Sequence, residues 1–288
     1  MTLLPTFRSQ WFRLSVLALM VAALIIYVGR SIRNLQYRLL YYPSSSTPPD
    51  QLLRANNMAL WRASGADYRG LAALNPPGSG KGTVVVFHGN GGSAADRGFY
   101  LDALGALGYR VVLAEYPMYG GRTGELGERS FVGDARESIR FALEDFGGPL
   151  FILGESLGCG IAAAAAREAP VPIHGVILIT PWDTLASVAK GKFPFLPVRL
   201  LLRDEYDTVR NLGSFQGRIV VVGAGRDEVI PVEHAGKLYD SLPGTAKKLW
   251  IFQEAGHNDW YRFASVDWWR DVMEFAGGGS GIFQAPPY

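Results

Sequence analysis

The sequence predicts an α/β protein with a mostly parallel central sheet, helices on both faces of that sheet, and one apolar helix ahead of it. Apolar runs of strand length recur along the chain, and segments of helix length separate most of them. These runs are almost continuous in valine, isoleucine and leucine, as in strands that are buried on both faces. A longer apolar run lies near the N-terminus.

Composition and charge restrict the class of protein further. Hydrophobic residues make up 48% of the 288 residues and charged residues 19%, which indicates a globular core and excludes a collagen-like or disordered chain. The net charge of +2 is not concentrated in a basic block, so no nucleic-acid partner is expected. The single cysteine, Cys159, excludes an internal disulfide framework and a cysteine-based zinc site.

Residues 14–28 form an uncharged apolar run, which Trp11 and Phe12 extend. A membrane-spanning helix needs about 20 apolar residues, and Arg13 can snorkel from this stretch to the interface. We therefore predict a single-pass membrane anchor over residues 12–29. A cleaved signal peptide and a buried helix are the alternatives, although no small-residue cleavage motif follows the run.

The charges that flank the anchor leave its orientation open. Arg8 and Arg13 precede it, together with the amino terminus, and Arg30, Arg33 and Arg38 follow it. The positive-inside rule therefore hardly distinguishes the two orientations of the anchor. The short basic N-terminal tail slightly favours export of the following domain.

The rest of the chain divides at changes in composition. We predict an N-terminal tail (1–11), a juxtamembrane segment and linker (30–57), one main domain (58–276) and a C-terminal tail (277–288). The serines and prolines of PSSSTPPD, residues 43–50, cannot continue a helix or a ladder. The C-terminal tail is rich in glycine, and we predict that it is disordered.

The main domain begins with a weak strand pair, residues 58–63 and 68–74, joined by a turn at residues 65–67. Stronger strands follow at residues 83–88, 109–116, 149–155, 174–180, 218–225 and 248–257. Helices are predicted between them at residues 94–107, 131–146 and 157–169. One connection, residues 183–215, is much longer than a strand-to-helix loop needs, so we predict a cap insertion there.

Ser156 is the candidate nucleophile. It lies between Gly154 and Gly158, at the end of a central strand and at the start of a helix of small residues. Such a turn projects the serine hydroxyl from the sheet, and the first N–H groups of the helix favour developing negative charge. A serine that only caps the helix is the alternative.

The candidate base is His257, which closes the last strand. His174 begins a strand and so belongs to the opposite edge of the sheet, whereas His88 precedes the serine. His234 lies in the first turn of a helix, only a few residues beyond Asp227. The chain order serine, aspartate, histidine, which serine hydrolases of this architecture follow, selects His257.

The candidate acid is Asp227, in the loop after the penultimate strand, where it can hold the imidazole of the base. Asp183, after the preceding strand, is the second candidate, and Glu228 is the third. An aspartate in a glycine-rich turn can also serve only that turn.

The oxyanion of the reaction needs two backbone donors. Leu157 supplies one, directly after the nucleophile, and Asn90 or Gly91 in the HGNGG loop supplies the other. No phosphate-binding glycine frame fits this loop. The glycine-rich segment from Glu115 is predicted to shape the pocket wall, with Tyr116 or Tyr119 as alternative substrate contacts.

The motifs HGNGG, EYPMYGGRTGE, GESLG, TPWDTL, GRDEVIP and AGHND occur in this order, and with them the chain resembles the α/β-hydrolase superfamily. It is most similar to the membrane-anchored, Bem46-like hydrolases, also termed serine aminopeptidase-like, over residues 58–276. The resemblance implies a nucleophile at Ser156, an acid at Asp227, a base at His257, and a bacterial inner membrane as location. It departs at Glu115, where relatives often carry aspartate.

These observations predict a serine hydrolase for acyl esters or thioesters that requires no cofactor and no metal. A peptidase or acyltransferase on the same fold, and a non-catalytic binding module, are the alternatives. The cap is rich in apolar residues, most of which we expect to pack it onto the domain, and it favours a small, lipid-like acyl substrate. These residues are Phe193, Phe195, Leu196, Val198, Leu200, Leu201 and Leu202. The sequence leaves the acyl group and the oligomeric state open.

Overall fold

A central sheet of eight strands organises the domain in the computed structural model, which describes residues 5–44, 46–62, 68–76, 80–244 and 246–279. The strand order is β10-β9-β8-β7-β4-β6-β3-β2. Neighbouring strands from β10 to β6 pair in parallel, whereas β3 and β2 add antiparallel pairs at one edge. The predicted α/β class is therefore confirmed.

The strands coincide with the apolar runs of the sequence, except that the last one ends at Phe252, so His257 lies in the following loop and does not close the strand as predicted. Their bounds are β2 (Met58–Arg62), β3 (Tyr68–Ala73), β4 (Thr83–Phe87), β6 (Arg110–Ala114), β7 (Leu150–Glu155), β8 (Gly175–Ile179), β9 (Arg218–Ala224) and β10 (Lys247–Phe252). The turn at residues 65–67 lies outside the described residues, as does most of the predicted C-terminal tail, residues 280–288.

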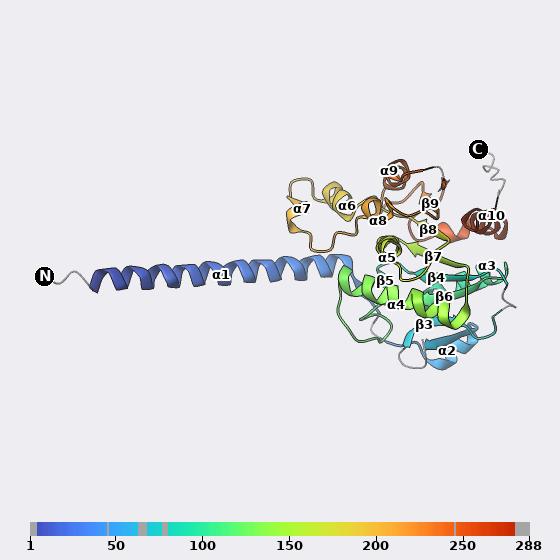
Figure 1. Ribbon diagram of the computed structural model, residues 1–288, viewed down its shortest axis with the longest axis horizontal. Helices are drawn as coiled ribbons and strands as arrows, with labels where there is room; N and C mark the ends of the chain where they lie inside the picture. The colour runs from blue at the N-terminus through green and yellow to red at the C-terminus, as the bar shows by residue number, and fades with distance from the viewer. Residues whose placement is uncertain (1–4, 45, 63–67, 77–79, 245, 280–288) are drawn as a thin grey trace.

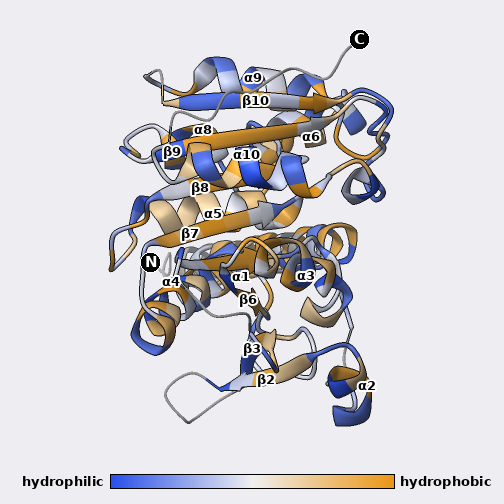
Figure 2. Cartoon of the chain, turned by 90° about the vertical axis from the view of Figure 1, so that its right-hand side faces the viewer, coloured by the Kyte–Doolittle hydropathy of each residue, from blue (hydrophilic) through white to orange (hydrophobic). Residues whose placement is uncertain are grey.

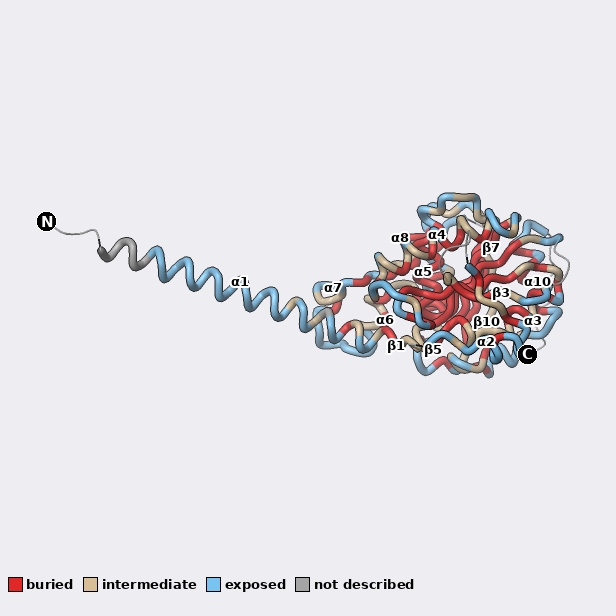
Figure 3. The backbone as a smooth tube through the Cα atoms, turned by 90° about the horizontal axis from the view of Figure 1, so that it is seen from below, coloured by how far each residue is buried: buried red, intermediate tan, exposed pale blue. Residues whose placement is uncertain are grey.

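Helices cover both faces of the sheet. One face packs against α4 (Glu128–Phe146), α5 (Leu157–Arg167) and α9 (Glu233–Ser241), and the other against α3 (Phe99–Gly105) and α10 (Val266–Ala276). Successive strand residues therefore enter different cores, which explains why inner strands such as β7 and β9 are apolar throughout (Figure 2; Figure 3).

The helix predicted at residues 94–107 is divided in two. A short 3-10 helix, η2 (Ala94–Arg97), precedes α3, and Gly98 separates them. Ser93 begins η2 with a capping box, in which its backbone N–H donates to the Asp96 carboxylate at 2.8 Å.

The N-terminal helix α1 (Pro5–Leu40) projects from one side of the domain (Figure 1). It continues to Leu40, well past the predicted end of the anchor at residue 29. Its residues 11–40 are long and apolar enough to cross a membrane, a test that a signal sequence also passes.

The prediction of a linker after α1 is wrong in part, because a portion of this segment forms regular structure and packs against the domain. Within it, β1 (Tyr42–Pro43) pairs with β5 (Gly91–Gly92), and α2 (Asp50–Ala55) forms a short helix. Pro43 fits this ladder because the N–H donors are supplied by Tyr42 and Ser44 on either side of it, so its own missing N–H is not needed.

The connection between β8 and β9 forms the predicted insertion, called the cap below. It contains α6 (Leu185–Lys192), α7 (Val198–Leu201) and α8 (Thr208–Leu212). The expectation that most of its apolar residues pack onto the domain is wrong. Val198 is buried, whereas Phe193, Phe195, Leu196 and Leu200 are exposed, because this part of the cap extends beyond the sheet along α1 (Figure 1).

Candidate active site

Ser156 occupies a strained turn between β7 and α5. Its backbone has φ of 54°, a conformation that residues other than glycine rarely adopt. The flanking glycines make this turn possible: a Cβ on Gly154 would overlap the carbonyl oxygen of Gly158, and one on Gly158 would overlap that of Phe87. The serine hydroxyl therefore projects at the carboxyl edge of the sheet, as the sequence predicts.

The structure brings the three predicted triad residues together. The Oγ of Ser156 lies 3.0 Å from Nε2 of His257, and Nδ1 of His257 lies 2.7 Å from Oδ2 of Asp227. The other carboxylate oxygen of Asp227 accepts backbone N–H groups from Val229 and Ile230, at 2.8 and 2.7 Å. Asp227 is therefore held in place, and its second oxygen is directed at the histidine.

Asp183, the second candidate for the acid, has a different partner. Its Oδ1 lies 2.6 Å from Nδ1 of His234 and accepts the hydroxyl of Ser187 at 2.7 Å. Burial raises the pKa of Asp183, but the hydrogen bonds from His234 and Ser187 outweigh burial and leave its pKa below the ordinary value. The third candidate, Glu228, is exposed.

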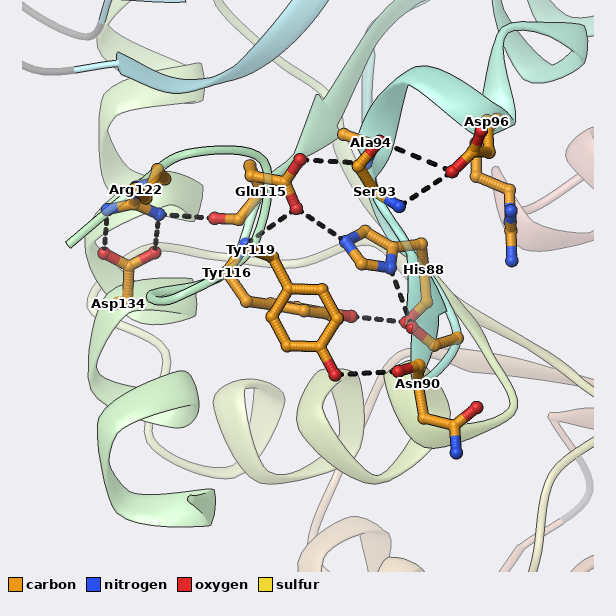
Figure 4. Close-up of polar contacts among 12 residues, drawn as sticks. His88, Asn90, Ser93, Ala94, Asp96, Glu115, Tyr116, Tyr119, Arg122 and Asp134 are labelled. Atoms are coloured by element: carbon orange, nitrogen blue, oxygen red, sulfur yellow. Dashed lines mark hydrogen bonds and ion pairs between the residues drawn. The ribbon is translucent and has the colours of Figure 1, made fainter. Parts of the chain in front are cut away.

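The loop after β4 is held by the buried carboxylate of Glu115, a role that the sequence analysis did not predict. Nε2 of His88 lies 2.9 Å from one carboxylate oxygen of Glu115, and the other oxygen accepts the backbone N–H of Ala94 at 3.0 Å (Figure 4). The other ring nitrogen of His88 donates to the carbonyl of Gly89 at 2.7 Å. The Gly89 carbonyl and the Asn90 N–H belong to one trans peptide, in which they point in opposite directions. By binding that carbonyl, His88 sets the direction of the Asn90 N–H.

Tyr116 and Tyr119 bind the carbonyl groups of the same loop. The hydroxyl of Tyr116 donates to the carbonyl of His88 at 2.6 Å, and that of Tyr119 to the carbonyl of Asn90 at 2.7 Å (Figure 4). Burial raises the pKa of both phenols, which keeps them as neutral donors. Both rings are buried, which matches the predicted structural role of this segment and not the alternative of substrate contact.

A cavity of about 310 Å³ opens above Ser156. Asn90 and Leu157, two of the predicted oxyanion donors, line it together with the serine, whereas Gly91 instead pairs with Tyr42 in the β1–β5 ladder. The N–H of Leu157 stands at the first position of α5, where helices leave donors unused. The remaining lining is mostly apolar and comes largely from the cap and from the end of α1.

The contribution of α1 to this cavity was missed by the sequence analysis, which treated the helix as an anchor only. Its lining residues are Ile32, Leu35, Gln36, Leu39 and Leu40. Hydrogen bonds tie the end of the helix to the cap, from Tyr41 to Asp204 at 2.6 Å and from the backbone of Arg203 to Gln36 at 2.9 Å. Gln36 did not indicate this contact in the sequence, because it is one of several polar residues near the end of α1, which also carries Arg33 and Asn34.

The fold of the domain is the α/β-hydrolase fold. A family model described as the alpha/beta hydrolase fold matches residues 82–205. Among solved structures, an esterase of Pyrococcus furiosus aligns with a TM-score of 0.60 at 20% identity, covering 81% of this chain and 97% of that one. A monoacylglycerol lipase of Paleococcus ferrophilus aligns with a TM-score of 0.53 at 20% identity, covering 70% and 96%.

Curated relatives agree with this fold. An uncharacterized protein of Mycobacterium tuberculosis, Rv2307c, is 27% identical over 251 residues, which cover 85% of this chain and 87% of the relative. The lysophosphatidylserine lipase ABHD12 of Gallus gallus is 26% identical over 247 residues, covering 76% and 64%. The chain therefore has the α/β-hydrolase fold and is similar in sequence to proteins of that fold. Its placement among the Bem46-like hydrolases stays a prediction.

Proposed function

We propose that this protein is a membrane-anchored serine hydrolase that cleaves acyl esters or thioesters. His257 takes the proton of Ser156 as the hydroxyl attacks the acyl carbonyl, and Asp227 holds the imidazole and stabilises its charged form. The N–H groups of Leu157 and Asn90 bind the oxyanion. His257 then protonates the leaving group, and water releases the acid from the acyl-enzyme.

One observation carries this proposal: two contacts of 3.0 and 2.7 Å join Ser156, His257 and Asp227, and Ser156 lines a cavity. Contacts of this length allow the proton transfers that a serine nucleophile needs. Asp183 and His234 also lie together, but Ser187 and Asp183 both approach the same nitrogen of His234. That second cluster therefore lacks the relay arrangement, in which the two ring nitrogens have different partners.

The character of the cavity supports a lipid-like acyl substrate. Its lining is mainly aliphatic, and Lys192 is its one charged residue within the described part of the chain. An aminopeptidase would need a carboxylate there for the free amine of its substrate. Similarity to proteins named as lipases and an esterase supports the same substrate class.

The N-terminal helix supports membrane attachment. Side chains of α1 from residue 11 to residue 28 are exposed all around the helix, although they are mainly apolar. Such a helix is stable in a lipid environment and unfavourable in water. We place the protein in a membrane as a single-pass protein, with the orientation of its domain left open.

Labelling with a fluorophosphonate probe tests the proposal. The wild-type full-length protein should form a covalent adduct at Ser156, and Ser156→Ala should form none and lose turnover by several orders of magnitude. Ser187→Ala is the matched control and should label as the wild type does. Labelling that survives Ser156→Ala would contradict the assigned nucleophile, and product analysis with an added alcohol separates hydrolysis from acyl transfer.

A further inference from the structure

The cap carries an exposed apolar tip, residues 193–200, on the side of the domain from which α1 projects (Figure 1). Phe195 is 97% exposed and Leu200 is 86% exposed, and Phe193 and Leu196 are exposed as well. Large apolar side chains gathered on one surface are unfavourable in water and mark a site of interaction. The cap tip therefore needs a partner outside this chain.

The cap meets α1 at the level where the predicted anchor ends. A Cβ built on Gly29 would lie 3.5 Å from the guanidinium of Arg203, and the apolar run stops at Val28. An α-helix rises about 1.5 Å per residue, so the cavity-lining turns up to Leu40 extend only roughly 16 Å beyond Gly29. The cap tip and the entrance of the cavity thus lie at the height of the membrane surface if residues 12–29 span the bilayer.

The charges beside the cap tip fit an anionic lipid surface. Lys190, Lys192 and Arg199 are exposed, and no acidic residue occurs from residue 190 to residue 203. Basic side chains next to exposed phenylalanine and leucine are typical of segments that lie in the headgroup region of a bilayer. A soluble protein partner would not require the cap tip to lie beside the end of the membrane helix.

The cavity reaches the cap tip. Phe193 and Leu196 belong to the tip and also line the cavity, opposite Leu35 and Leu39 of α1. Both residues are partly open to the outside, with 43% and 48% of their surfaces exposed. These two side chains therefore extend from the cavity wall to the outer surface of the cap tip.

We infer that the cap tip docks on the anionic surface of the bilayer that holds α1, and that the acyl chain of the substrate passes from this leaflet between α1 and the cap to Ser156. The substrate class is then a membrane-resident lipid with a long acyl chain, taken from the bilayer and not from water. The passage of substrate rests on the proposed hydrolase function, whereas the docking of the cap tip does not.

Depth-dependent fluorescence quenching tests the docking. The Phe195→Cys variant of the full-length protein is labelled with an environment-sensitive fluorophore and placed in vesicles of phosphatidylcholine and phosphatidylglycerol. The native Cys159 is buried and should not take up the label. Lipids that carry a nitroxide should quench this probe strongly. A probe on Leu52→Cys, exposed on α2 at the far side of the domain (Figure 1), should be quenched little. Equal quenching of the two probes would overturn the proposal. A probe at position 195 that is shielded from water but not quenched by lipid would also overturn it, and would indicate a protein partner or a second copy.

Kinetics test the passage of substrate. Neither Phe195 nor Leu200 lines the cavity. In a double variant, Phe195→Ser with Leu200→Ser, we expect the rate of hydrolysis of a long-chain ester in vesicles to fall about tenfold or more. The reason is that the apolar area of these two side chains no longer enters the bilayer. Hydrolysis of a water-soluble acetyl ester should be unchanged, and Leu52→Ser should change neither rate. Equal losses on both substrates would overturn the proposed passage. A wild type inactive on both would contradict the hydrolase function and leave the quenching result to decide docking.

Discussion

The side-chain amide of Asn90 donates a hydrogen bond of 2.9 Å to the carbonyl of Leu40, so the candidate oxyanion loop is joined directly to the end of the N-terminal helix. The backbone N–H of Tyr42 reinforces this joint by donating to the carbonyl of Asn90 at 2.9 Å. The helix that we propose as the membrane anchor is therefore continuous with the loop that supports the reaction.

Asn90→Ala removes the bond to Leu40 but keeps the backbone N–H that we assign to the oxyanion. We expect kcat for a short ester to fall about tenfold, less than the 10²–10³-fold that follows complete loss of an oxyanion donor. Asn56→Ala, at the exposed end of α2, is the control and should leave kcat unchanged. A wild-type kcat for Asn90→Ala would show that the joint has no effect on the loop.

Glu115→Gln keeps the shape of the buried side chain and removes its charge. The contacts of this side chain with His88 and Ala94 should weaken, so the Asn90 N–H should lose its fixed direction. We expect kcat to fall about tenfold with little change in KM, because the loop acts on the transition state. An increase in KM alone would instead indicate a role in substrate binding.

Asp227→Asn should lower kcat about 10⁴-fold, because the amide favours the wrong tautomer of His257. Asp183→Asn should lower it by less than about threefold, since Asp183 contacts His234 and not the catalytic histidine. Steady-state kinetics of the two variants compare the two acids directly, and the reverse order of effects would move the acid to Asp183.

Asp183 should instead contribute to stability in a pH-dependent way. Its pKa is lower in the folded protein than in the unfolded chain, where it is about 3.9. The charged form therefore stabilises the fold above that value, and this contribution is lost as the pH falls through the lower folded pKa. Asp183→Asn should cost about 1–2 kcal/mol at pH 7, and denaturation curves should converge with those of the wild type at strongly acidic pH. A constant difference across the pH range would contradict this assignment.

Gly158→Ala tests the turn that presents Ser156. The new methyl group would overlap the carbonyl oxygen of Phe87, so we expect a loss of at least about 2 kcal/mol in unfolding free energy. Gly133→Ala is a matched control, because it lies in α4 with no atom near its Cβ position and should stabilise the helix by about 0.4–1 kcal/mol. Thermal denaturation of both variants measures the contrast.

The local pattern of the sequence was sufficient for the fold class, the order of the elements and the turn around Ser156. Strand runs that are apolar throughout indicate burial on both faces, and glycines at positions 154 and 158 report a crowded turn, because both signals depend on residues close together in the chain. The positions of Asp227 and His257 followed from strand order, since parallel strands end at the same edge of the sheet.

Tertiary structure decided the rest, because those features depend on side chains that approach from distant segments. Only the fold pairs Asp183 with His234 and places Glu115 under the loop of His88. The apolar pattern of α1 and the cap indicates burial but not the environment that provides it, so the sequence alone predicted a separate anchor and a packed cap. The structure instead places the end of α1 in the wall of the cavity and exposes the cap tip, since the position of α1 against the cap depends on contacts between residues more than 160 positions apart, such as Tyr41 and Asp204.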